Sequence, residues 1–363
     1  MIKPIQNEYM PDVVSPPGET LMEMLEERGM SQAELAERTG RPKKTINEII
    51  KGKATITPAT ALQLERVLGA PASFWNNREQ HYRENLARQA ERDSLEGQVD
   101  WLSQFPIKAM VDFGWLKGLQ DPVELLGEVL NFFGIAAPTQ WQRIWVETGI
   151  AFRQSPTFES DPFAVSAWLR KGEIDAQTLD CAPYNADRFL GALKVVRELT
   201  TQAPDVFQPG TVQVCAEAGV AVAFVPELPK VRASGATRWL TPNKALIQVN
   251  LRYKTDDQLW FTFFHEAGHI LKHGKREIFI EDGDNQDKKE EEANRFAADF
   301  LLPPTEYRHF VPRAGHYSKA EIKNFAERLK IAPGIVVGRL QYDGKLPKQN
   351  CNDLKQHLKW AND

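Results

Sequence analysis

Two histidines separated by three residues constrain this chain more than any other feature. His265 and His269 flank Glu266 in the string His-Glu-Ala-Gly-His, directly after the apolar run at residues 260–264. Residues four apart lie on one face of an α-helix, so both imidazoles would point to the same side of a helix whose start is buried. Such a pair can share a zinc ion at about 2.0–2.1 Å. The string therefore predicts a helix that carries a metal site.

A catalytic zinc site requires a third protein ligand, and the acidic segment at residues 290–292 offers one. Glu290 shares a helical stripe with residues that face inward, namely Ala293, Asn294, Ala297 and Leu301. Glu292 instead lies on a more polar face of the same helix. We therefore expect Glu290 to be the third metal ligand. Asn294, one turn further on, is positioned to orient a ligand from behind.

Such a site supports hydrolysis. Zinc lowers the pKa of its bound water toward about 7, and Glu266 accepts the proton as the water attacks a polarised peptide carbonyl. Two alternatives stay open: the string occurs by chance on a structural helix, or the site binds metal without turnover. A purely structural zinc is normally closed by four protein ligands and gives Glu266 little purpose. His273 continues the face of His269 by one turn, and we interpret it as a supporting or surface residue rather than a ligand.

The composition is that of an ordinary globular protein. The chain has 363 residues, enough for two or three domains, with 26% charged and 42% hydrophobic residues and a formal charge of −4. This net charge does not indicate nucleic-acid binding. Three scattered cysteines exclude a disulfide framework. The chain shows neither a signal-peptide pattern nor the roughly 18 apolar residues of a membrane span, so we expect a cytoplasmic protein without a membrane partner.

Apolar periodicity and turn residues divide the chain into three segments. Residues 15–86 show helix-period apolar positions broken by glycines, which is typical of a small all-helical domain. Residues 87–205 form a helical middle region to which the sequence assigns no chemistry. Residues 206–363 contain β-branched runs at 220–225 and 245–250 before the histidine helix, and a helical tail. We expect a multidomain, mainly helical protein in which an all-α domain precedes an α+β domain.

A helix-turn-helix pattern lies within the first segment. Ser31 can cap a helix at residues 32–38, with Glu34 as its capping-box partner. Gly40 permits a tight turn after this helix, and Pro42 suits the first position of the next one. The second helix is anchored by its apolar residues, Ile46, Ile49 and Ile50. Two short helices that meet at a glycine are therefore predicted.

Basic and polar side chains surround this turn. Between residues 38 and 53, six basic residues and one glutamate give a local balance of +5 within an acidic protein. Basic side chains suit phosphate contacts, and long polar ones reach base edges in the major groove. The candidate DNA contacts are Gln32, Arg41, Lys43, Lys44, Thr45, Asn47, Glu48 and Lys51. The alternative is a helical hairpin with a solvated charged face.

This pattern resembles the XRE-type helix-turn-helix of lambda-repressor-like regulators. The run at residues 31–36, followed by Gly40, Ile46 and Gly52, carries the resemblance. The wider stretch is similar to HigA-type antitoxins at four places, residues 17–19, 52–53, 56–61 and 73–75. The resemblance implies binding of operator DNA by a homodimer whose two helices read adjacent major grooves. Residues 41–42 depart from the pattern, so the operator sequence does not transfer.

The histidine string and the acidic helix resemble the ImmA/IrrE metallopeptidases, which cleave phage-type or stress-response repressors. The resemblance rests on five stretches, residues 224–229, 234–239, 265–269, 290–297 and 301–303. It implies a zinc-dependent, gluzincin-like endopeptidase domain with a protein substrate. The family is thought to bind its substrate beside a strand edge, and we expect residues 245–250 to offer that edge by β-augmentation.

Taken together, these features predict an antitoxin-like, DNA-binding transcription regulator with a zinc-dependent endopeptidase site. Its substrate would be a repressor, a cognate toxin or the chain itself. One alternative is a non-enzymatic antitoxin whose metallopeptidase-like domain is a sensor or partner-binding module. Another is a plain metallopeptidase whose N-terminal domain binds protein instead of DNA. Salt-dependent binding to the chain's own promoter distinguishes this last alternative from the other two.

Overall fold

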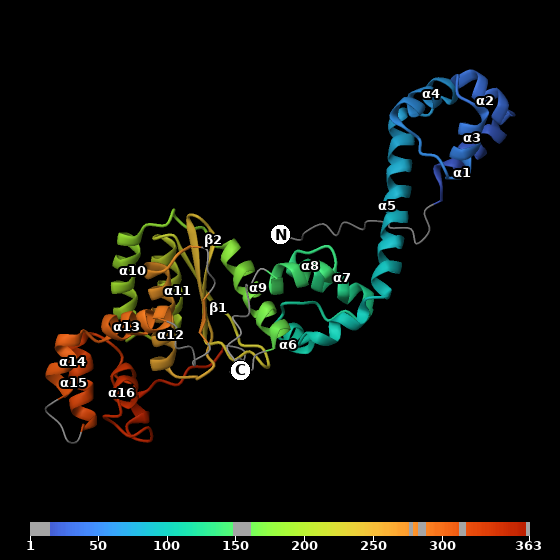
Figure 1. Cartoon of the computed structure of the whole chain (residues 1–363). Helices are drawn as coiled ribbons and strands as arrows, with labels where there is room; N and C mark the ends of the chain where they lie inside the picture. Colours follow the sequence, from blue (N-terminus) through green and yellow to red (C-terminus); the bar gives the residue numbers. More distant parts are fainter. Residues whose placement is uncertain (1–14, 148–160, 276–278, 282–287, 312–316, 361–363) are drawn as a thin grey trace. The chain divides into compact units, whose positions relative to one another are not determined.

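The computed structural model divides into two compact units, Met1–Gln98 and Val99–Asp363 (Figure 1). It describes residues 15–147, 161–275, 279–281, 288–311 and 317–360. Helices dominate both units, and a small sheet lies in the second. The predicted mainly helical, multidomain architecture is therefore confirmed. No helix in the described ranges combines the length and apolarity needed to cross a bilayer.

The first unit is all-helical. It consists of α1 (Pro17–Glu27), α2 (Gln32–Thr39), α3 (Lys43–Ile50), α4 (Pro58–Leu68) and α5 (Ala72–Glu96). The predicted start of α2 is confirmed, because the Ser31 hydroxyl accepts a hydrogen bond from the backbone N of Glu34 at 3.1 Å. Gly40 ends α2 with a φ of 68°, a left-handed conformation that glycine adopts without strain. The hydrophobic core of this first unit includes Leu21, Leu35, Ile46, Ile49, Leu64 and Trp75.

The long helix α5 is fixed to this unit along its first turns. Arg78 Nη2 donates to the Oγ of Ser15 and to Oγ1 of Thr20, each at 2.9 Å, and Arg83 Nη2 donates to the Gly52 carbonyl at 3.2 Å. The helix then continues without a break to Glu96, so the expected boundary at residues 86–87 falls inside it. The division into three segments stays a prediction.

The second unit begins with a helical region. Its elements are η1 (Val99–Gln104), α6 (Ile107–Asp112), α7 (Pro122–Phe133), α8 (Pro138–Trp141), η2 (Gln142–Glu147) and α9 (Pro162–Thr178). Aromatic side chains form its interior: Trp141 stacks on Phe163 with 4.3 Å between ring centroids, and Phe105 meets both edge-on. Aromatic packing of this kind gives the region a core of its own.

A four-stranded sheet follows, with the strand order β1-β3-β2-β4. The strands are β1 (Val220–Phe224), β2 (Gly235–Thr241), β3 (Lys244–Val249) and β4 (Phe279–Glu281). The two predicted strands correspond to β1 and β3, whereas β2 and β4 were not predicted. β3 pairs with β1 in parallel and with β2 in antiparallel orientation. Both of its edges are therefore occupied, and the expectation that residues 245–250 offer an edge to a substrate is wrong.

Helices cover both faces of the sheet (Figure 1). One face lies on α9, where Gln248 Nε2 donates to the Trp168 carbonyl at 2.7 Å. The other face packs against α10 (Ala186–Leu199), α11 (Pro204–Ala216) and α12 (Asp256–Lys272). Alternate residues of a strand face opposite sides of the sheet. Thr237 faces this second side, where its Oγ1 donates to the Glu266 carbonyl at 3.1 Å. The histidine string lies on α12, as predicted.

The C-terminal helices pack on this core. They are α13 (Lys288–Leu301), α14 (Pro304–Phe310), α15 (Lys319–Leu329), α16 (Pro333–Tyr342) and the short η4 (Asn352–Leu354). Arg197 of α10 donates to the carbonyl of Leu301 at 3.1 Å and to that of Leu329 at 2.9 Å, where α13 and α15 end. One guanidinium thus satisfies helix-terminal carbonyls of two helices. The predicted helical tail is confirmed.

The start of α12 is held by the chain's last described segment. The backbone N of Asp256 donates to the Gln356 carbonyl, and the backbone N of Gln356 donates to Oδ1 of Asp256, both at 3.0 Å. Lys355 Nζ lies 2.7 Å from Oδ2 of Asp257, and both side chains are largely buried. These contacts fix the first turn of the helix that carries the histidines.

Candidate functional sites

The histidine string lies in the interior of the second unit. Apolar side chains of α12, including Trp260, Phe263 and Phe264, are buried in the main core and fix the rotation of the helix. His265, Glu266 and His269 are 1%, 0% and 2% exposed, respectively. Water has little access to these side chains, so their polar atoms act on one another and on whatever the site holds.

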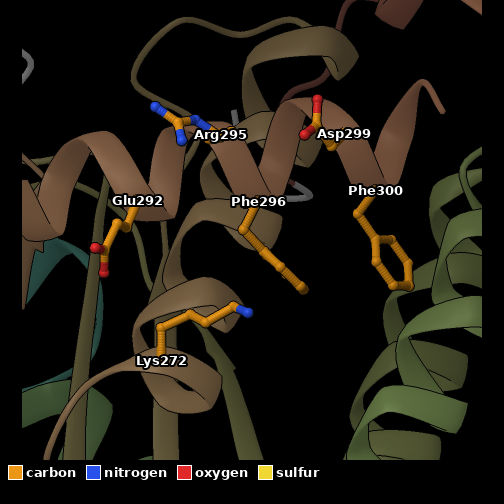
Figure 2. A pocket seen from close by; sticks show the side chains of 6 residues that line it. All are labelled: Lys272, Glu292, Arg295, Phe296, Asp299 and Phe300. Carbon is orange, nitrogen blue, oxygen red and sulfur yellow. The ribbon is translucent and has the colours of Figure 1, made fainter. Parts of the chain in front are cut away.

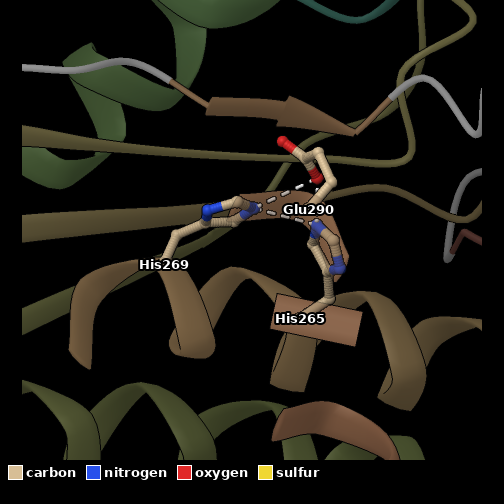
Figure 3. Close-up of side chains that lie close together, drawn as sticks. All are labelled: His265, His269 and Glu290. Atoms are coloured by element: carbon tan, nitrogen blue, oxygen red, sulfur yellow. Dashed lines mark hydrogen bonds and ion pairs between the residues drawn. The ribbon is translucent and has the colours of Figure 1, made fainter. Parts of the chain in front are cut away.

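The three predicted metal ligands converge (Figure 3). The Nε2 atoms of His265 and His269 are 2.9 Å apart, and Oε2 of Glu290 lies 3.0 Å from the first and 3.4 Å from the second. Ligands at about 2.0–2.1 Å from a tetrahedral zinc are about 3.3 Å from one another. The observed triangle is slightly smaller than a zinc ligand triangle, so these residues fit the metal after a small expansion. Within the described ranges this is the one such cluster of metal-ligating side chains.

A glycine in the string lets the two ligand-bearing helices approach. A Cβ on Gly268 would lie 3.2 Å from the Cα of Ala293 and 3.1 Å from the ring of Phe296, both on α13. Such contacts are close, so a larger side chain would push α13 away from α12. Glu290 lies one turn before Ala293, and the close approach brings its carboxylate to the imidazoles.

Hydrogen bonding sets the tautomer of His265. Its Nδ1 lies 2.9 Å from Oδ1 of Asn294. Because an amide oxygen only accepts, Nδ1 of His265 donates, and its Nε2 presents a lone pair to the cluster. The predicted place of Asn294 behind a ligand agrees with this contact. On the other side, the ring of Phe279 in β4 stacks on His269 with 4.0 Å between centroids.

The ionisation states suit a cation. Burial lowers the pKa of His269 below its ordinary value, which keeps the imidazole neutral at pH 7. Burial by itself raises the pKa of Glu290, but its close contacts with His265 and His269 outweigh burial and lower that pKa to about 2. A neutral imidazole and an ionised carboxylate are the forms that bind metal.

Glu266 lies between α12 and β2. A Cβ on Gly235 would lie 2.6 Å from its Oε1 and 2.9 Å from its Cγ, so the side chain rests directly on the backbone of the strand. It neighbours His265 in the sequence but does not belong to the ligand triangle. The contact fixes the position of this carboxylate against β2, on the residue that follows a candidate metal ligand.

The candidate DNA contacts lie on α2, on α3 and beside them. Lys43, Lys44 and Lys51 are exposed, and the other candidates, namely Gln32, Arg41, Thr45, Asn47 and Glu48, are partly buried. Asn47 Nδ2 donates to Oε1 of Gln32 at 3.3 Å, which ties α3 to the start of α2. Arg41 Nε donates to Oε1 of Gln63 at 2.6 Å, so α4 holds part of this guanidinium.

Comparison with known families agrees with this two-part structure. Residues 21–75 match the helix-turn-helix family, and residues 218–341 match the M78 peptidase family, described as an IrrE N-terminal-like domain. The chain joins a helix-turn-helix domain to an IrrE N-terminal-like domain. The first domain holds the candidate DNA contacts, and the second holds the metal cluster and Glu266. No curated protein matches the chain.

Three solved structures that are similar to part of the chain are antidote or antitoxin proteins. An antidote protein of a plasmid maintenance system from Nostoc punctiforme is 30% identical, with 23% of this chain and 91% of that chain covered and a TM-score of 0.23. A HigA-family antidote protein from Coxiella burnetii is 29% identical, with coverages of 23% and 92% and a TM-score of 0.22. Antitoxin HigA from Pseudomonas aeruginosa is 30% identical, with coverages of 23% and 94% and a TM-score of 0.22.

Three features of the IrrE N-terminal-like domain escaped the sequence reading. Gly235 and Gly268 make room for Glu266 and for α13, and Phe279 stacks on a histidine. Gly268, inside the histidine string, was a signal of close helix packing. Glycine costs about 1 kcal/mol in a helix interior, so its presence there indicates that packing requires it. Gly235 lies in the stretch 234–239 that carries the ImmA/IrrE resemblance, but the apolar pattern predicted neither its strand nor that of Phe279.

Proposed function

We propose that this protein is an antitoxin-like transcription regulator whose IrrE N-terminal-like domain is a zinc-dependent endopeptidase. The observation that carries the proposal is the buried triangle of His265, His269 and Glu290, with Glu266 buried on the same helix as the two histidines. Two neutral imidazoles, one carboxylate ligand and a separate carboxylate are the set that zinc hydrolases use. A structural zinc would call for a fourth protein ligand, and among the residues that the structure describes the cluster contains three.

The residues divide the work of peptide hydrolysis. When bound, zinc supplies a Lewis acid that polarises the scissile carbonyl and acidifies a water. Glu266 accepts the proton of the attacking water and later delivers it to the leaving amine. Asn294 keeps the Nε2 lone pair of His265 directed at the cluster through its 2.9 Å contact with Nδ1. Burial of Glu266 excludes bulk water and strengthens its interaction with the reacting groups.

We place the substrate chain beside β4. This strand pairs with β2 on one side through Gly235, Ala236 and Thr237, and it is an outer strand of the sheet within the described residues. Its Phe279 stacks on His269, so a peptide added to the outer edge of β4 would pass close to the metal ligands. Addition of a strand satisfies the peptide's backbone hydrogen bonds and holds it extended for attack.

The helix-turn-helix domain binds operator DNA in this proposal. The side chains of Lys43 and Lys44 are exposed at the start of α3, where they reach a major groove or its phosphates. A homodimer would present two copies of α3 to the two halves of a symmetric operator. Cleavage of a repressor, of a cognate toxin or of the chain itself would then change what is bound at that operator.

A cleavage assay with paired variants tests the enzymatic part. The zinc-loaded full chain is mixed with the proteins encoded next to it, and fragments are identified by mass spectrometry. We expect the wild type to cleave one partner or itself, and Glu266→Gln to retain zinc but lose at least a hundredfold in rate. The matched control is Glu291→Gln, which makes the same carboxylate-to-amide change at an exposed position on α13. This variant should cleave at the wild-type rate. Equal rates for wild type and Glu266→Gln would contradict the general-base role.

A further inference from the structure

His273 connects a candidate metal ligand to a carboxylate at the surface. Its Nδ1 lies 2.9 Å from Nδ1 of His269, and its Nε2 lies 3.3 Å from Oε2 of Glu292. The His273 side chain is 3% exposed, whereas that of Glu292 is 46% exposed. The ring of Phe279 covers His273 at 5.3 Å between centroids. A continuous line of hydrogen-bonding atoms therefore runs from the solvent to the cluster.

The direction of these hydrogen bonds follows from the chemistry of the end groups. An ionised carboxylate only accepts hydrogen bonds, so Nε2 of His273 donates a hydrogen bond to the Glu292 carboxylate. In a neutral imidazole the other nitrogen is then an acceptor, which makes Nδ1 of His269 the donor between the two rings. Nε2 of His269 is left with a lone pair, and this atom faces His265 and Glu290.

We propose that His273 and Glu292 are positioning residues that fix the tautomer and orientation of His269 for metal binding. The proposal rests on the proposed zinc site and extends it to residues that touch neither metal nor substrate. It assigns different supports to the two ligand histidines: an amide oxygen from Asn294 holds His265, and a histidine with a carboxylate behind it holds His269. A carboxylate partner increases the basicity of the ring that it holds and, through that ring, of the ligand.

The Glu292 carboxylate is available to accept a hydrogen bond from His273. Glu292 lines a cavity of about 570 Å³ with Lys272, Arg295, Phe296, Asp299 and Phe300 (Figure 2). Among the described residues, the side chain that contacts the Glu292 carboxylate is that of His273. The preceding residue, Glu291, is exposed, and its side chain forms no hydrogen bond or ion pair with another described residue. It therefore provides a matched control on the same helix.

Metal affinity of the full chain tests the proposal without any cleavage assay. The zinc dissociation constant is measured by competition with a chromophoric chelator for the wild type, His273→Leu, His273→Asn and Glu292→Gln. Leucine fills a similar space but accepts no hydrogen bond, so we expect affinity to fall about 10–100-fold. Asparagine restores an oxygen acceptor for Nδ1 of His269 and should recover most of the loss. Glu292→Gln should give a smaller loss, and Glu291→Gln none.

Cobalt absorption and thermal unfolding separate positioning from folding. We expect His273→Leu to weaken the visible bands of bound Co²⁺, while the metal-free protein unfolds at the wild-type temperature. Wild-type affinity in His273→Leu would overturn the proposal, as would equal losses in the leucine and asparagine variants. If His273→Leu does not fold, identical affinities of Glu292→Gln and Glu291→Gln overturn it instead. A wild type that binds neither metal would refute the zinc site itself, a different result from an intact site that ignores His273.

Discussion

Gly235 of β2 and Glu266 of α12 are in direct contact: a Cβ on the glycine would lie 2.6 Å from Oε1 of the glutamate. The same Cβ would lie 2.6 Å from the methyl group of Thr262, one turn earlier on α12. Neither contact leaves room for a side chain at residue 235. The strand therefore sets where the carboxylate stands relative to the metal ligands, although it contributes no functional side chain of its own.

Gly235→Ala should impair turnover while preserving the metal. The added methyl group displaces the Glu266 carboxylate or the strand, and misplacement of a catalytic group by about 1 Å costs about a hundredfold in rate. None of the three ligands is among the atoms nearest to this Cβ, so zinc stoichiometry should be unchanged. Steady-state cleavage rates and metal analysis on the same preparation check this.

Gly191→Ala provides the control for a glycine-to-alanine change in the same unit. A Cβ there meets no atom within 4 Å, and the residue lies inside α10. We expect wild-type cleavage and slightly greater stability, because alanine favours a helix over glycine by about 1 kcal/mol. Full activity of Gly235→Ala would mean that the position of Glu266 does not limit the rate.

Lys43→Ala and Lys44→Ala should weaken operator binding. Both side chains are exposed, and Lys44 Nζ is 3.8 Å from Oε1 of Glu48, a loose pair that DNA can replace. Loss of a lysine that contacts a guanine edge costs about 1–3 kcal/mol of binding free energy. Loss of one that contacts a phosphate lowers the slope of log affinity against log salt concentration by about 1. Fluorescence anisotropy with the chain's own promoter at several salt concentrations distinguishes the two roles. Lys345→Ala, an exposed change in the second unit, is the control, and unchanged binding by both α3 variants would remove them from the interface.

Asp256→Asn should stabilise the second unit at neutral pH. Burial, with the nearby charge of Asp257, raises the pKa of Asp256 from 3.8 to about 6. Between these values the unfolded chain releases a proton that the folded chain keeps, so this group's contribution to stability falls as pH rises and then levels off. Asparagine keeps the oxygen that accepts from the backbone N of Gln356 and cannot ionise.

The expected gain in unfolding free energy is on the order of 1–3 kcal/mol at pH 7 and vanishes below about pH 4. Chemical denaturation of the metal-free full chain at pH 4, 5, 6 and 7, followed through the second unit's tryptophans, measures it. A difference between variant and wild type that stays constant across this range would show that Asp256 does not titrate there.

The sequence predicted the parts of the fold that depend on local periodicity. The capping of α2 by Ser31, the turn at Gly40 and the helix of the histidine string all follow from spacing within one or two turns. The stripe that placed Glu290 inward and Glu292 outward was also local, and both carboxylates lie as predicted.

What escaped prediction depends on contacts between distant segments. The prediction that β3 offers a free edge is wrong, because a strand's neighbours are set by the whole sheet and the sequences of β2 and β4 show only weak strand patterns. The same holds for the start of α12, which Gln356 anchors from 100 residues away. Local patterns cannot report such pairings, since they arise only once the core has formed.

The central claim is that one zinc ion is held by His265, His269 and Glu290. Zinc stoichiometry and affinity of the full chain, compared between Glu290→Ala and Glu291→Ala, test it most directly. We expect one zinc per chain for the wild type and for Glu291→Ala, and a loss of tight binding for Glu290→Ala and for His269→Ala. Equal, tight zinc binding by Glu290→Ala and Glu291→Ala, or no zinc in the wild type, would contradict the account.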